Sequence, residues 1–274
     1  MKDFRGTVAA ITGAASGMGR ALAQNLAGQG AHLALADIDE AGLAETVALC
    51  EGRGVKVTSQ RLDVADKDAV FAWADQVEAE HGRVDLVINN AGVALGATVE
   101  GMSYEDLEWL MGINFWGVVH GTKAFLPKLT AQRSGHIVNI SSVFGLMSIP
   151  SQSAYNAAKF GVRGFTDALR MELEIGDTGV SCTTIHPGGI KTNIAKNARM
   201  DDSAAAMAGS DGAADLEKAF MTTPEKAARQ ILKAVQRNRR RALIGPDAKA
   251  FDLLARMPAG VYQRTIVFGA KRRK

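Results

Sequence analysis

Short runs with the character of β-strands recur along the chain and alternate with stretches that have helical periodicity. These runs cover residues 7–12, 31–36, 55–61, 84–89, 135–141, 179–185 and 241–244. The most apolar of them, such as residues 31–36 and 84–89, are typical of strands that a parallel sheet buries on both faces. Between them, residues 17–29 illustrate the helical pattern, because Met18, Leu22, Leu26 and Ala27 form one apolar stripe. The alternation predicts an α/β fold, a doubly wound parallel sheet of about seven strands with helices on both faces.

Length and composition fit a single domain over residues 1–274. The chain is 47% hydrophobic and 22% charged, which is enough for one buried α/β core. Within it, residues 193–222 are rich in Ala and Met, and the turn residues 209–212 interrupt any long helix there, so we predict a mobile substrate lid. The helix after the lid is predicted to begin at Thr223-Pro224-Glu225. Residues 246–274 form a predicted C-terminal extension whose apolar side chains pack on the lid or on another subunit.

The formal net charge is +3, and the positive charge is concentrated in residues 237–241 and 271–274. Neither cluster contains an aromatic residue that could stack on bases, so we expect no nucleic-acid binding. Only Cys50 and Cys182 are present, too few for a disulfide framework or a metal-binding cluster, and no metal is expected.

The chain shows no pattern of a membrane span or a leader. Its longest uncharged run, residues 136–158, contains Asn and several Ser, and the first apolar strand is too short for a signal peptide. A cytoplasmic location is therefore predicted, and membrane contact is not favoured. The alternative is a peripheral membrane enzyme whose basic tail and neighbouring apolar residues touch anionic lipid.

The first apolar run leads directly into a glycine-rich turn and then into a helix. Gly13, Gly17 and Gly19 allow a tight turn in which backbone N–H groups approach a pyrophosphate at the positive end of the helix. This order of strand, turn and helix predicts a dinucleotide site in a sheet of the Rossmann type. Glycines with such spacing also occur in plain strand-to-helix turns, so the turn alone is weak evidence.

Asp37 ends the second predicted strand, eighteen residues after Gly19. A carboxylate at this place accepts hydrogen bonds from an adenosine ribose and repels a 2′-phosphate. Neither Ser16 nor Ile38 is basic, so NAD is favoured over NADP. The alternative role for Asp37 is to cap the following helix. Arg20, a cation just past the glycines, is expected to face solvent or a subunit partner.

Tyr155 and Lys159 lie four residues apart, and Ser142 precedes the tyrosine by thirteen. Residues at i and i+4 share one helix face, so we expect the ammonium of Lys159 to favour the phenolate of Tyr155, whose ordinary pKa is about 10. Such a tyrosine could act as a general base near neutral pH, and Ser142 could hold the substrate oxygen beside it. Tyr and Lys at this spacing also occur by chance, so the pair gains weight only from the other motifs.

Together these motifs resemble the short-chain dehydrogenase/reductase family over nearly the whole chain. In that family Asp63-Val64 would contact adenine, Asn89-Asn90-Ala91-Gly92 would follow the fourth strand, and the segment from Pro187 to Thr192 would meet the nicotinamide. The resemblance implies four catalytic residues, Ser142, Tyr155, Lys159 and Asn114, the last anchoring a water chain to the lysine. It implies a cofactor site formed by Gly13, Ser16, Gly17, Met18, Gly19, Asp37, Asp63, Val64, Asn90, Ala91, Gly92, Tyr155, Lys159, Pro187, Gly188, Ile190 and Thr192.

Some of these residues have structural alternatives. Asp63 could cap a strand end, Asn89 and Asn90 could satisfy backbone groups in a turn, and Ser141 is expected to support the turn beside Ser142.

The resemblance implies an oxidoreductase that moves a hydride between NAD(H) and an alcohol or ketone. Residues 93–95 and 143–147, which would line the pocket, are almost wholly apolar, so a hydrophobic secondary alcohol or ketone is favoured. The alternatives are an NADP-dependent carbonyl reductase and, less favoured, an inactive dinucleotide-binding protein. Relatives are homodimers or homotetramers built on helices that would begin here near Tyr104 and Gln152. Small residues on the second of these helices would permit close approach, namely Ala154, Ala157, Ala158, Gly161 and Gly164.

Overall fold

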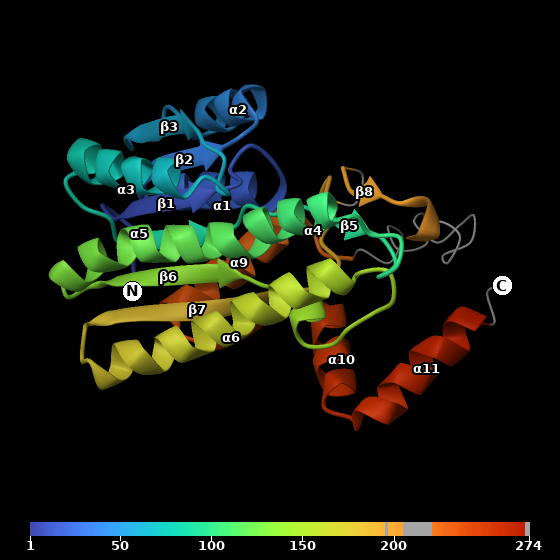
Figure 1. Ribbon diagram of the computed structural model, residues 1–274. Coiled ribbons are helices and arrows are strands. Elements are labelled where there is room, and N and C mark those ends of the chain that lie inside the picture. Colours follow the sequence, from blue (N-terminus) through green and yellow to red (C-terminus); the bar gives the residue numbers. More distant parts are fainter. Residues whose placement is uncertain (195–196, 205–220, 272–274) are drawn as a thin grey trace.

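Seven parallel strands form the central sheet, in the order β3-β2-β1-β4-β6-β7-β9 (Figure 1). The strands are β1 (Val8–Thr12), β2 (His32–Asp37), β3 (Val57–Arg61), β4 (Leu86–Asn89), β6 (Gly135–Ile140), β7 (Val180–Pro187) and β9 (Arg241–Ile244). The computed structural model describes residues 1–194, 197–204 and 221–271. The predicted parallel doubly wound sheet is confirmed, and each run that predicted a strand overlaps one of the seven.

Helices cover both faces of this sheet (Figure 1). They are α1 (Gly17–Gly28), α2 (Glu40–Cys50), α3 (Lys67–His81), α4 (Tyr104–Met111), α5 (Gly117–Ala131), α6 (Ser153–Ile175), α9 (Pro224–Gln236), α10 (Pro246–Ala255) and α11 (Ala259–Lys271). One apolar core joins α1, α2 and α9 to the sheet through side chains such as Leu22, Leu43 and Ile231. A second core joins α3, α5 and α6 to the other face through Trp73, Phe125 and Leu169. Both faces of the sheet are therefore covered, which leaves the ends of its strands for a ligand.

The strand order reverses between β1 and β4. In open α/β sheets the ligand crevice lies at this switch point, outside the carboxyl ends of the strands. The glycine turn follows β1, Asp37 ends β2, and Asn90 follows β4. The topology thus gathers the predicted dinucleotide residues at one edge of the sheet.

The long helix expected after Tyr104 is interrupted. Residues Gly112–Trp116 form a π-helical turn, η1, between α4 and α5, and Asn114 lies within it. Such single-turn π insertions occur frequently at functional sites. The helix expected near Gln152 begins as predicted, with Gln152 at the cap of α6. The start at Thr223 is also confirmed, because its side chain accepts a hydrogen bond from the Lys226 N–H (3.3 Å) and Pro224 opens α9.

Part of the predicted lid lies outside the described residues, including all of 205–220 with its Gly-Ser-Asp-Gly turn. The described part contains β8 (Arg199–Met200), which pairs in parallel with β5 (Leu95–Gly96). Arg199 lies over the ring of Trp109 at 3.8 Å and forms an ion pair with Asp106 at 2.8 Å, both on or beside α4. The beginning of this segment is therefore attached to α4, an attachment that the sequence did not indicate.

None of the described helices is long and apolar enough to cross a bilayer. Within the same residues, no cluster of His, Cys, Asp or Glu is arranged to hold a metal ion. Cys50 and Cys182 are separate buried thiols, and burial raises the pKa of Cys182 to about 12. Neither thiol is activated as a nucleophile, because only the thiolate reacts and burial disfavours it.

Candidate active site

The glycine turn after β1 has the backbone conformation that only glycine adopts easily. Gly13 and Gly17 have φ values of 66° and 53°. A Cβ at Gly13 would lie 2.8 Å from the Cα of Ala91, so the turn packs directly against the segment after β4. Asn90 ties the two segments together by donating from Nδ2 to the carbonyls of Thr12 and Gly13, both at 3.0 Å. Asn90 thus shapes the turn through hydrogen bonds to its backbone.

The amino end of α1 is left open. Ser16 is its N-cap residue, is exposed, and makes no side-chain capping bond. In contrast, α2, α3, α4 and α9 are each capped by a side chain, from Asp39, Asp66, Ser103 and Thr223 respectively. The first turn of α1 also has no acidic residue. Its free N–H groups and the positive end of its dipole can therefore bind an anion.

Asp37 faces this turn and does not cap α2. Its carboxylate accepts from the backbone N–H of Ala15 (2.8 Å) and from that of Asp39 (3.0 Å), whereas Asp39 caps the helix. The carboxylate is only partly buried. It is thus held at the end of β2 beside the open end of α1, as the dinucleotide hypothesis requires.

The prediction for Arg20 is wrong. Arg20 pairs with Glu45 at 2.8 Å and donates to the hydroxyl of Thr46 (3.0 Å) and to the carbonyl of Gly42 (3.0 Å). It also donates to the carbonyl of Ala15 at 2.5 Å. The guanidinium therefore joins α1 to α2 within the subunit, because its five donors find acceptors there.

Ser142 follows β6 and begins the short 3-10 turn η2 (Val143–Gly145). Its hydroxyl accepts from the Phe144 N–H at 3.1 Å. Its carbonyl is bound to Nδ1 of His186 at 2.8 Å, so the neutral ring donates from Nδ1. Burial lowers the pKa of His186 to about 4, which keeps the ring neutral. Sequence analysis named His186 only as part of the segment around Pro187 and missed its contact with Ser142. That hydrogen bond forms because β6 pairs with β7.

Tyr155 and Lys159 share one face of α6, as predicted. The Lys159 Nζ lies 5.6 Å from the centroid of the Tyr155 ring. Nζ also donates to the carbonyl of Ile140 at 3.1 Å, and the lysine is almost wholly buried. Burial lowers the pKa of Lys159 to about 8. The structure thus brings the pair together at the end of β6.

The predicted lowering of the pKa of Tyr155 is wrong. Burial raises the pKa of Tyr155, and a hydrogen bond with the Ser142 side chain opposes that shift. The ammonium of Lys159 donates to the backbone of β6, and burial lowers the pKa of the lysine itself. The phenol is therefore protonated near neutral pH.

Asn114 lies wholly buried in η1 and bonds the backbone of Val93 twice. Its Oδ1 accepts from the Val93 N–H and its Nδ2 donates to the Val93 carbonyl, both at 2.8 Å. A Cβ at Gly92 would lie 3.2 Å from Oδ1 of Asn114 and 3.6 Å from Nζ of Lys159. Gly92 therefore lies between Asn114 and Lys159. The two hydrogen bonds of Asn114 hold the segment after β4 beside the lysine.

The segment after β7 reaches across to the glycine turn. A Cβ at Gly17 would lie 3.0 Å from the Cγ2 of Thr192. Ile190 is buried and pairs with Thr222 in an isolated β-bridge. Pro187 ends β7, and the Gly188 N–H donates to the carbonyl of Ile244 at 2.9 Å. The predicted nicotinamide segment and the predicted pyrophosphate turn are thus neighbours.

Asp247, which sequence analysis missed, explains the pair of glycines after Pro187. It lies in the first turn of α10, and its Oδ2 accepts from the Gly189 N–H at 2.5 Å. A Cβ at Gly188 would overlap the Asp247 carboxylate. The C-terminal extension therefore supports this segment. An acid after Pro246 was visible in the sequence, but nothing there indicated its partner.

Replacing Gly188 by alanine is expected to lower the free energy of unfolding by about 1–3 kcal/mol, because the new Cβ would displace the carboxylate. Urea unfolding of Gly188→Ala in the wild-type background and in Asp247→Ala tests this. The loss should shrink strongly when Asp247 is absent. Equal losses in both backgrounds would mean that the overlap is not the cause.

The remaining predicted residues have more local roles. Asp63 is exposed and accepts from the Ala65 N–H at 2.9 Å, so it forms a local turn and α3 is capped by Asp66. Val64 is buried against Gly117. Met18 is partly buried against the first core. The alternative that Asn89 satisfies backbone groups in a turn is wrong, because its amide donates to the side chains of Asn139 and Thr122; only Asn90 bonds turn carbonyls. The Ser141 hydroxyl donates to the Lys159 carbonyl at 2.8 Å.

Aromatic side chains adjoin the tyrosine. Phe144 packs edge-on against Tyr155 with ring centroids 6.3 Å apart, and Phe251 of α10 packs on Phe144 at 6.2 Å. All three rings are partly exposed. A small apolar cluster that includes Leu95, Ala154 and Val93 also packs against Tyr155. The surroundings of the phenol are thus apolar, and α10 contributes to them.

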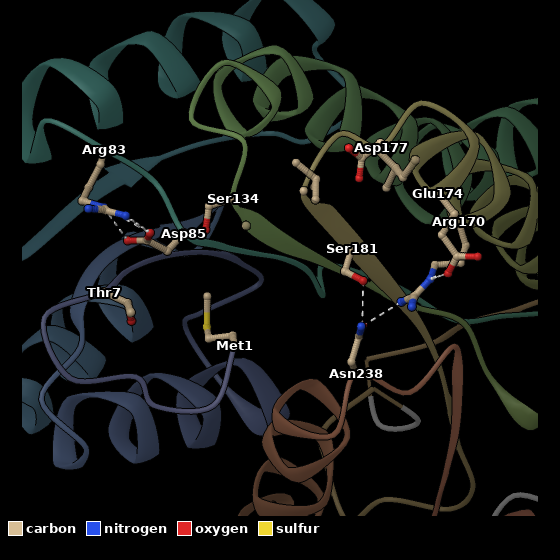
Figure 2. A pocket seen from close by; sticks show the side chains of 14 residues that line it. Met1, Thr7, Arg83, Asp85, Ser134, Arg170, Glu174, Asp177, Ser181 and Asn238 are labelled. Atoms are coloured by element: carbon tan, nitrogen blue, oxygen red, sulfur yellow. Dashed lines mark hydrogen bonds and ion pairs between the residues drawn. The ribbon is translucent and has the colours of Figure 1, made fainter.

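A polar hollow of about 590 Å³ lies at the opposite edge of the sheet (Figure 2). Its basic residues already have partners there: Arg83 pairs with Asp85, and Arg170 with Glu174 and Asn238. Ser181 also donates to Asn238, at 2.6 Å. Because this edge contains the amino ends of the strands, it is not the expected place for a dinucleotide.

Comparisons with known proteins agree with this geometry. A family model described as short chain dehydrogenase matches residues 7–203. SadH of Mycobacterium tuberculosis, a protein assigned to the oxidoreductases, is 49% identical over 273 residues, 98% of this chain and 97% of SadH. A short chain dehydrogenase/reductase from Burkholderia phymatum, crystallised with NAD, is 35% identical with a TM-score of 0.86, covering 93% of this chain and 94% of that one. Carveol dehydrogenase from Mycobacterium avium, also with NAD, is 27% identical with a TM-score of 0.75, covering 85% and 91%.

Proposed function

The chain is an oxidoreductase that belongs to the short-chain dehydrogenase/reductase family, and we propose that it transfers a hydride between NAD(H) and a hydrophobic secondary alcohol or ketone. The observation that carries this proposal is the contact of Ser142, Tyr155 and Lys159 at the end of β6, beside the open amino end of α1. The three side chains can handle a proton, and the helix end can hold an anion.

The residues at the switch point fit a dinucleotide. The glycine turn leaves the uncapped N–H groups of α1 free for a pyrophosphate, and Thr192 lies directly across from Gly17. Asp37 is held at the end of β2, where a ribose would reach it. Bound NAD would accept or donate the hydride at its nicotinamide ring.

Two observations favour NAD over NADP. The carboxylate of Asp37 would repel a 2′-phosphate at the ribose position. Arg20, the nearby cation, is already bound to Glu45 and to backbone carbonyls of the glycine turn and of α2, so it is not placed to neutralise that phosphate. Two structural neighbours, the Burkholderia and Mycobacterium avium proteins, were also crystallised with NAD.

The side chains divide the proton chemistry between them. Tyr155 exchanges a proton with the substrate oxygen, which lies between its hydroxyl and that of Ser142. The Ser142 hydroxyl donates to that oxygen and stabilises charge as it develops there. Lys159 places a cation behind the phenol, and Asn114 holds the segment of Gly92 and Val93 that adjoins the ammonium.

The apolar surroundings of Tyr155 support a hydrophobic substrate. Phe144 and Phe251 offer partly exposed aromatic faces, and Val93 adds an aliphatic side. A sugar would leave several hydroxyls without partners against these groups, at a cost of about 1–3 kcal/mol for each unpaired polar group. An aryl alcohol or a cyclic secondary alcohol suits such a pocket better.

A screen of hydrophobic secondary alcohols, monitored by NADH fluorescence and repeated with NADP, tests the proposal. We expect NADH formation with aryl or alicyclic alcohols and none with polyols. Higher kcat/KM with NADP than with NAD would instead identify the carbonyl-reductase alternative. Tight cofactor binding with no turnover of any alcohol or ketone would favour the inactive dinucleotide-binding alternative.

Asp37→Ser is expected to lower kcat/KM for NAD by about 10- to 100-fold and to raise kcat/KM for NADP, because it removes a charged hydrogen-bond acceptor from the ribose site. Asp39→Ser is a matched control, since serine can still cap α2 and the same charge is lost two residues away. Steady-state kinetics measure kcat/KM for NAD and for NADP in each variant. The assignment fails if both variants change the preference equally.

We further propose a homodimer or homotetramer built on α4, α5 and α6. The outer face of α6 exposes Phe160 and Met171, and Trp116 is half exposed where η1 meets α5. A Cβ at Gly164 would meet nothing, so this face has room for a second helix. Light scattering measures the mass directly, and a purely monomeric protein would contradict the proposal.

A further inference from the structure

Residues 187–192 connect the two halves of the proposed active site. The segment follows His186, which donates from Nδ1 to the carbonyl of Ser142 at 2.8 Å. It ends beside the glycine turn, where a Cβ at Gly17 would lie 3.0 Å from Cγ2 of Thr192. A dinucleotide whose pyrophosphate lies at the turn and whose reactive ring lies beside the proposed catalytic side chains would therefore run along this segment. Any group that fixes the segment would also fix the position of the nicotinamide.

The middle of the segment is formed by Gly188 and Gly189, which have no side chains to pack and lose much conformational freedom when they are ordered. The Gly188 N–H donates to the carbonyl of Ile244 at 2.9 Å, and the Gly189 carbonyl accepts from the Thr222 N–H at 3.3 Å. The Gly189 N–H donates to a side chain, at Oδ2 of Asp247 (2.5 Å). In the part of the chain that the structure describes, no other side chain hydrogen-bonds to the backbone of this segment.

Asp247 lies in the first turn of α10, where an acidic residue commonly stabilises the helix dipole. Two observations give it a further role. The amino end of α10 has no side-chain capping bond, so the carboxylate bonds to Gly189 and not to its own helix. The same carboxylate occupies the space that a side chain at Gly188 would need. The contact between Asp247 and the glycines is therefore specific in both hydrogen bonding and shape.

Thr222, the last residue of the predicted lid, approaches the same carboxylate. It is wholly buried, and its backbone pairs with the segment through an isolated β-bridge to Ile190. A Cβ at Gly245 would lie 2.6 Å from Oδ1 of Asp247 and 2.8 Å from Oγ1 of Thr222, so the two oxygens border the same point. Neither oxygen has a hydrogen-bond partner among the described residues. Asp247 therefore adjoins both the glycines and the residue that ends the lid.

The same helix also reaches the surroundings of the phenol. Phe251 follows Asp247 by four residues, so the two side chains share one face of α10. The Phe251 ring packs on Phe144 with centroids 6.2 Å apart, and Phe144 packs edge-on against Tyr155 at 6.3 Å. One face of α10 thus contacts the segment along which the dinucleotide would run and the ring beside the proposed general base.

We propose that Asp247 is a positioning residue for the nicotinamide end of the cofactor. Its carboxylate holds Gly188 and Gly189 in one conformation, so that the segment presents a fixed surface to the nicotinamide ring. The inference rests on the proposed function, because it needs a nicotinamide dinucleotide at this site. Loss of the carboxylate should weaken binding of the nicotinamide half and leave binding of the adenosine half unchanged. A purely structural role would weaken both halves together.

Calorimetric titration with NADH and with ADP-ribose separates the two halves of the cofactor. ADP-ribose has the adenosine, the pyrophosphate and the second ribose, but no nicotinamide. We expect the wild type to bind NADH more tightly than ADP-ribose, because only NADH can contact the whole segment. Asp247→Ala should raise the dissociation constant of NADH by about 10-fold or more and that of ADP-ribose by no more than about twofold, since the lost hydrogen bond to a charged group lies near the nicotinamide alone. Retained ADP-ribose binding also shows that the variant is folded.

The conservative variant Asp247→Asn should rescue NADH binding. Asparagine keeps an oxygen that can accept from the Gly189 N–H, and its amide nitrogen would then face the hydroxyl of Thr222, which can accept a hydrogen bond. The dissociation constant of NADH for this variant should therefore stay within about threefold of the wild-type value.

Asp252→Ala is the matched control, because it removes a second carboxylate from the same helix. Asp252 is buried and pairs with Arg241 at 3.1 Å and with Arg256 at 2.9 Å. These partners lie outside residues 187–192, so its loss affects the packing of α10 without removing a contact to the segment. The dissociation constants of NADH and of ADP-ribose should both stay within about twofold of wild type, because effects of distant sites are independent.

Equal affinity of the wild type for NADH and ADP-ribose would overturn the proposal, and so would unchanged NADH binding or equal losses for the two ligands in Asp247→Ala. A loss specific to NADH in Asp252→Ala would assign the effect to α10 as a whole. An Asp247→Asn protein as weak as Asp247→Ala would exclude the hydrogen bond to Gly189 as the cause, and the proposal would fail in that case too. All of these results leave the proposed function intact. A wild type that binds neither ligand would instead refute the dinucleotide site itself, and the positioning role with it.

Discussion

Tyr155→Phe is expected to lower kcat about 10³-fold while leaving the dissociation constant of NADH within about threefold of wild type. The substitution removes only the hydroxyl that exchanges a proton with the substrate. The ring remains, and so does its edge-on packing against Phe144. NADH fluorescence titration and steady-state kinetics measure the two quantities separately. Tyr104→Phe, at a tyrosine that is 82% exposed, is the matched control and should behave like wild type.

The pH dependence gives a second measure of the same hydroxyl. Burial raises the pKa of Tyr155 above its ordinary value, so the protonated form dominates near neutral pH. A protonated phenol can donate to a ketone, whereas alcohol oxidation needs the deprotonated form. We therefore expect oxidation to accelerate as pH rises and reduction to be efficient at neutral pH. If Tyr155→Phe keeps nearly full activity, or keeps the same rise of oxidation with pH, the tyrosine is not the proton donor and acceptor.

The parts of the site that were predicted from sequence depend on local spacing. Gly13 and Gly17 adopt positive φ, which few other residues tolerate, so a glycine motif between an apolar run and a helical stripe indicates the turn. Tyr155 and Lys159 share a face because the helix repeat places i and i+4 together. The position of Asp37 follows from the length of one strand–helix–strand unit. The catalytic and cofactor roles of these residues remain predictions, since geometry alone does not test them.

The parts that sequence could not provide depend on segments far apart in the chain. Asp247 reaches Gly189 from 58 positions away, and His186 reaches Ser142 from 44. Arg20 had acceptors on α2 that no local pattern marks. The π turn around Asn114 has no signal in hydrophobic periodicity, because one inserted residue shifts the pattern no more than ordinary helix irregularity does.

The wrong prediction for the pKa of Tyr155 also comes from contacts between segments that are far apart in the chain. The spacing correctly placed an ammonium near the ring, but the balance between attraction and desolvation depends on burial by β6, η1 and the segment after β4. In this protein desolvation has the larger effect on both partners, raising the pKa of Tyr155 and lowering that of Lys159. The ammonium of Lys159 therefore lies where burial disfavours its charge. Its effect on the stability of the fold can be measured separately from its effect on the reaction.

Lys159→Met is expected to abolish turnover and, at the same time, to stabilise the protein at neutral pH. The lysine has a pKa of about 8 in the folded state and about 10.4 when unfolded, so the unfolded chain binds more protons between these values. Stability should therefore rise with pH across that window in wild type, and the full penalty, on the order of 3 kcal/mol, is present below pH 8. Methionine removes this penalty but leaves the Ile140 carbonyl without its donor, a loss of about 1 kcal/mol.

The net gain for Lys159→Met should thus be about 1–2 kcal/mol at pH 7 and should disappear or reverse near pH 10.5, where wild-type Lys159 is already neutral in the folded state. Urea unfolding at both pH values measures it. Lys123→Met, on the exposed side of α5, is the control and should show no such pH dependence. A destabilised Lys159→Met protein at pH 7, or a gain that does not change with pH, would show that Lys159 is not a strained buried cation. The buried lysine lowers the stability of the wild-type protein. If Lys159→Met is more stable and has no turnover, the ammonium is needed for the reaction and not for the fold.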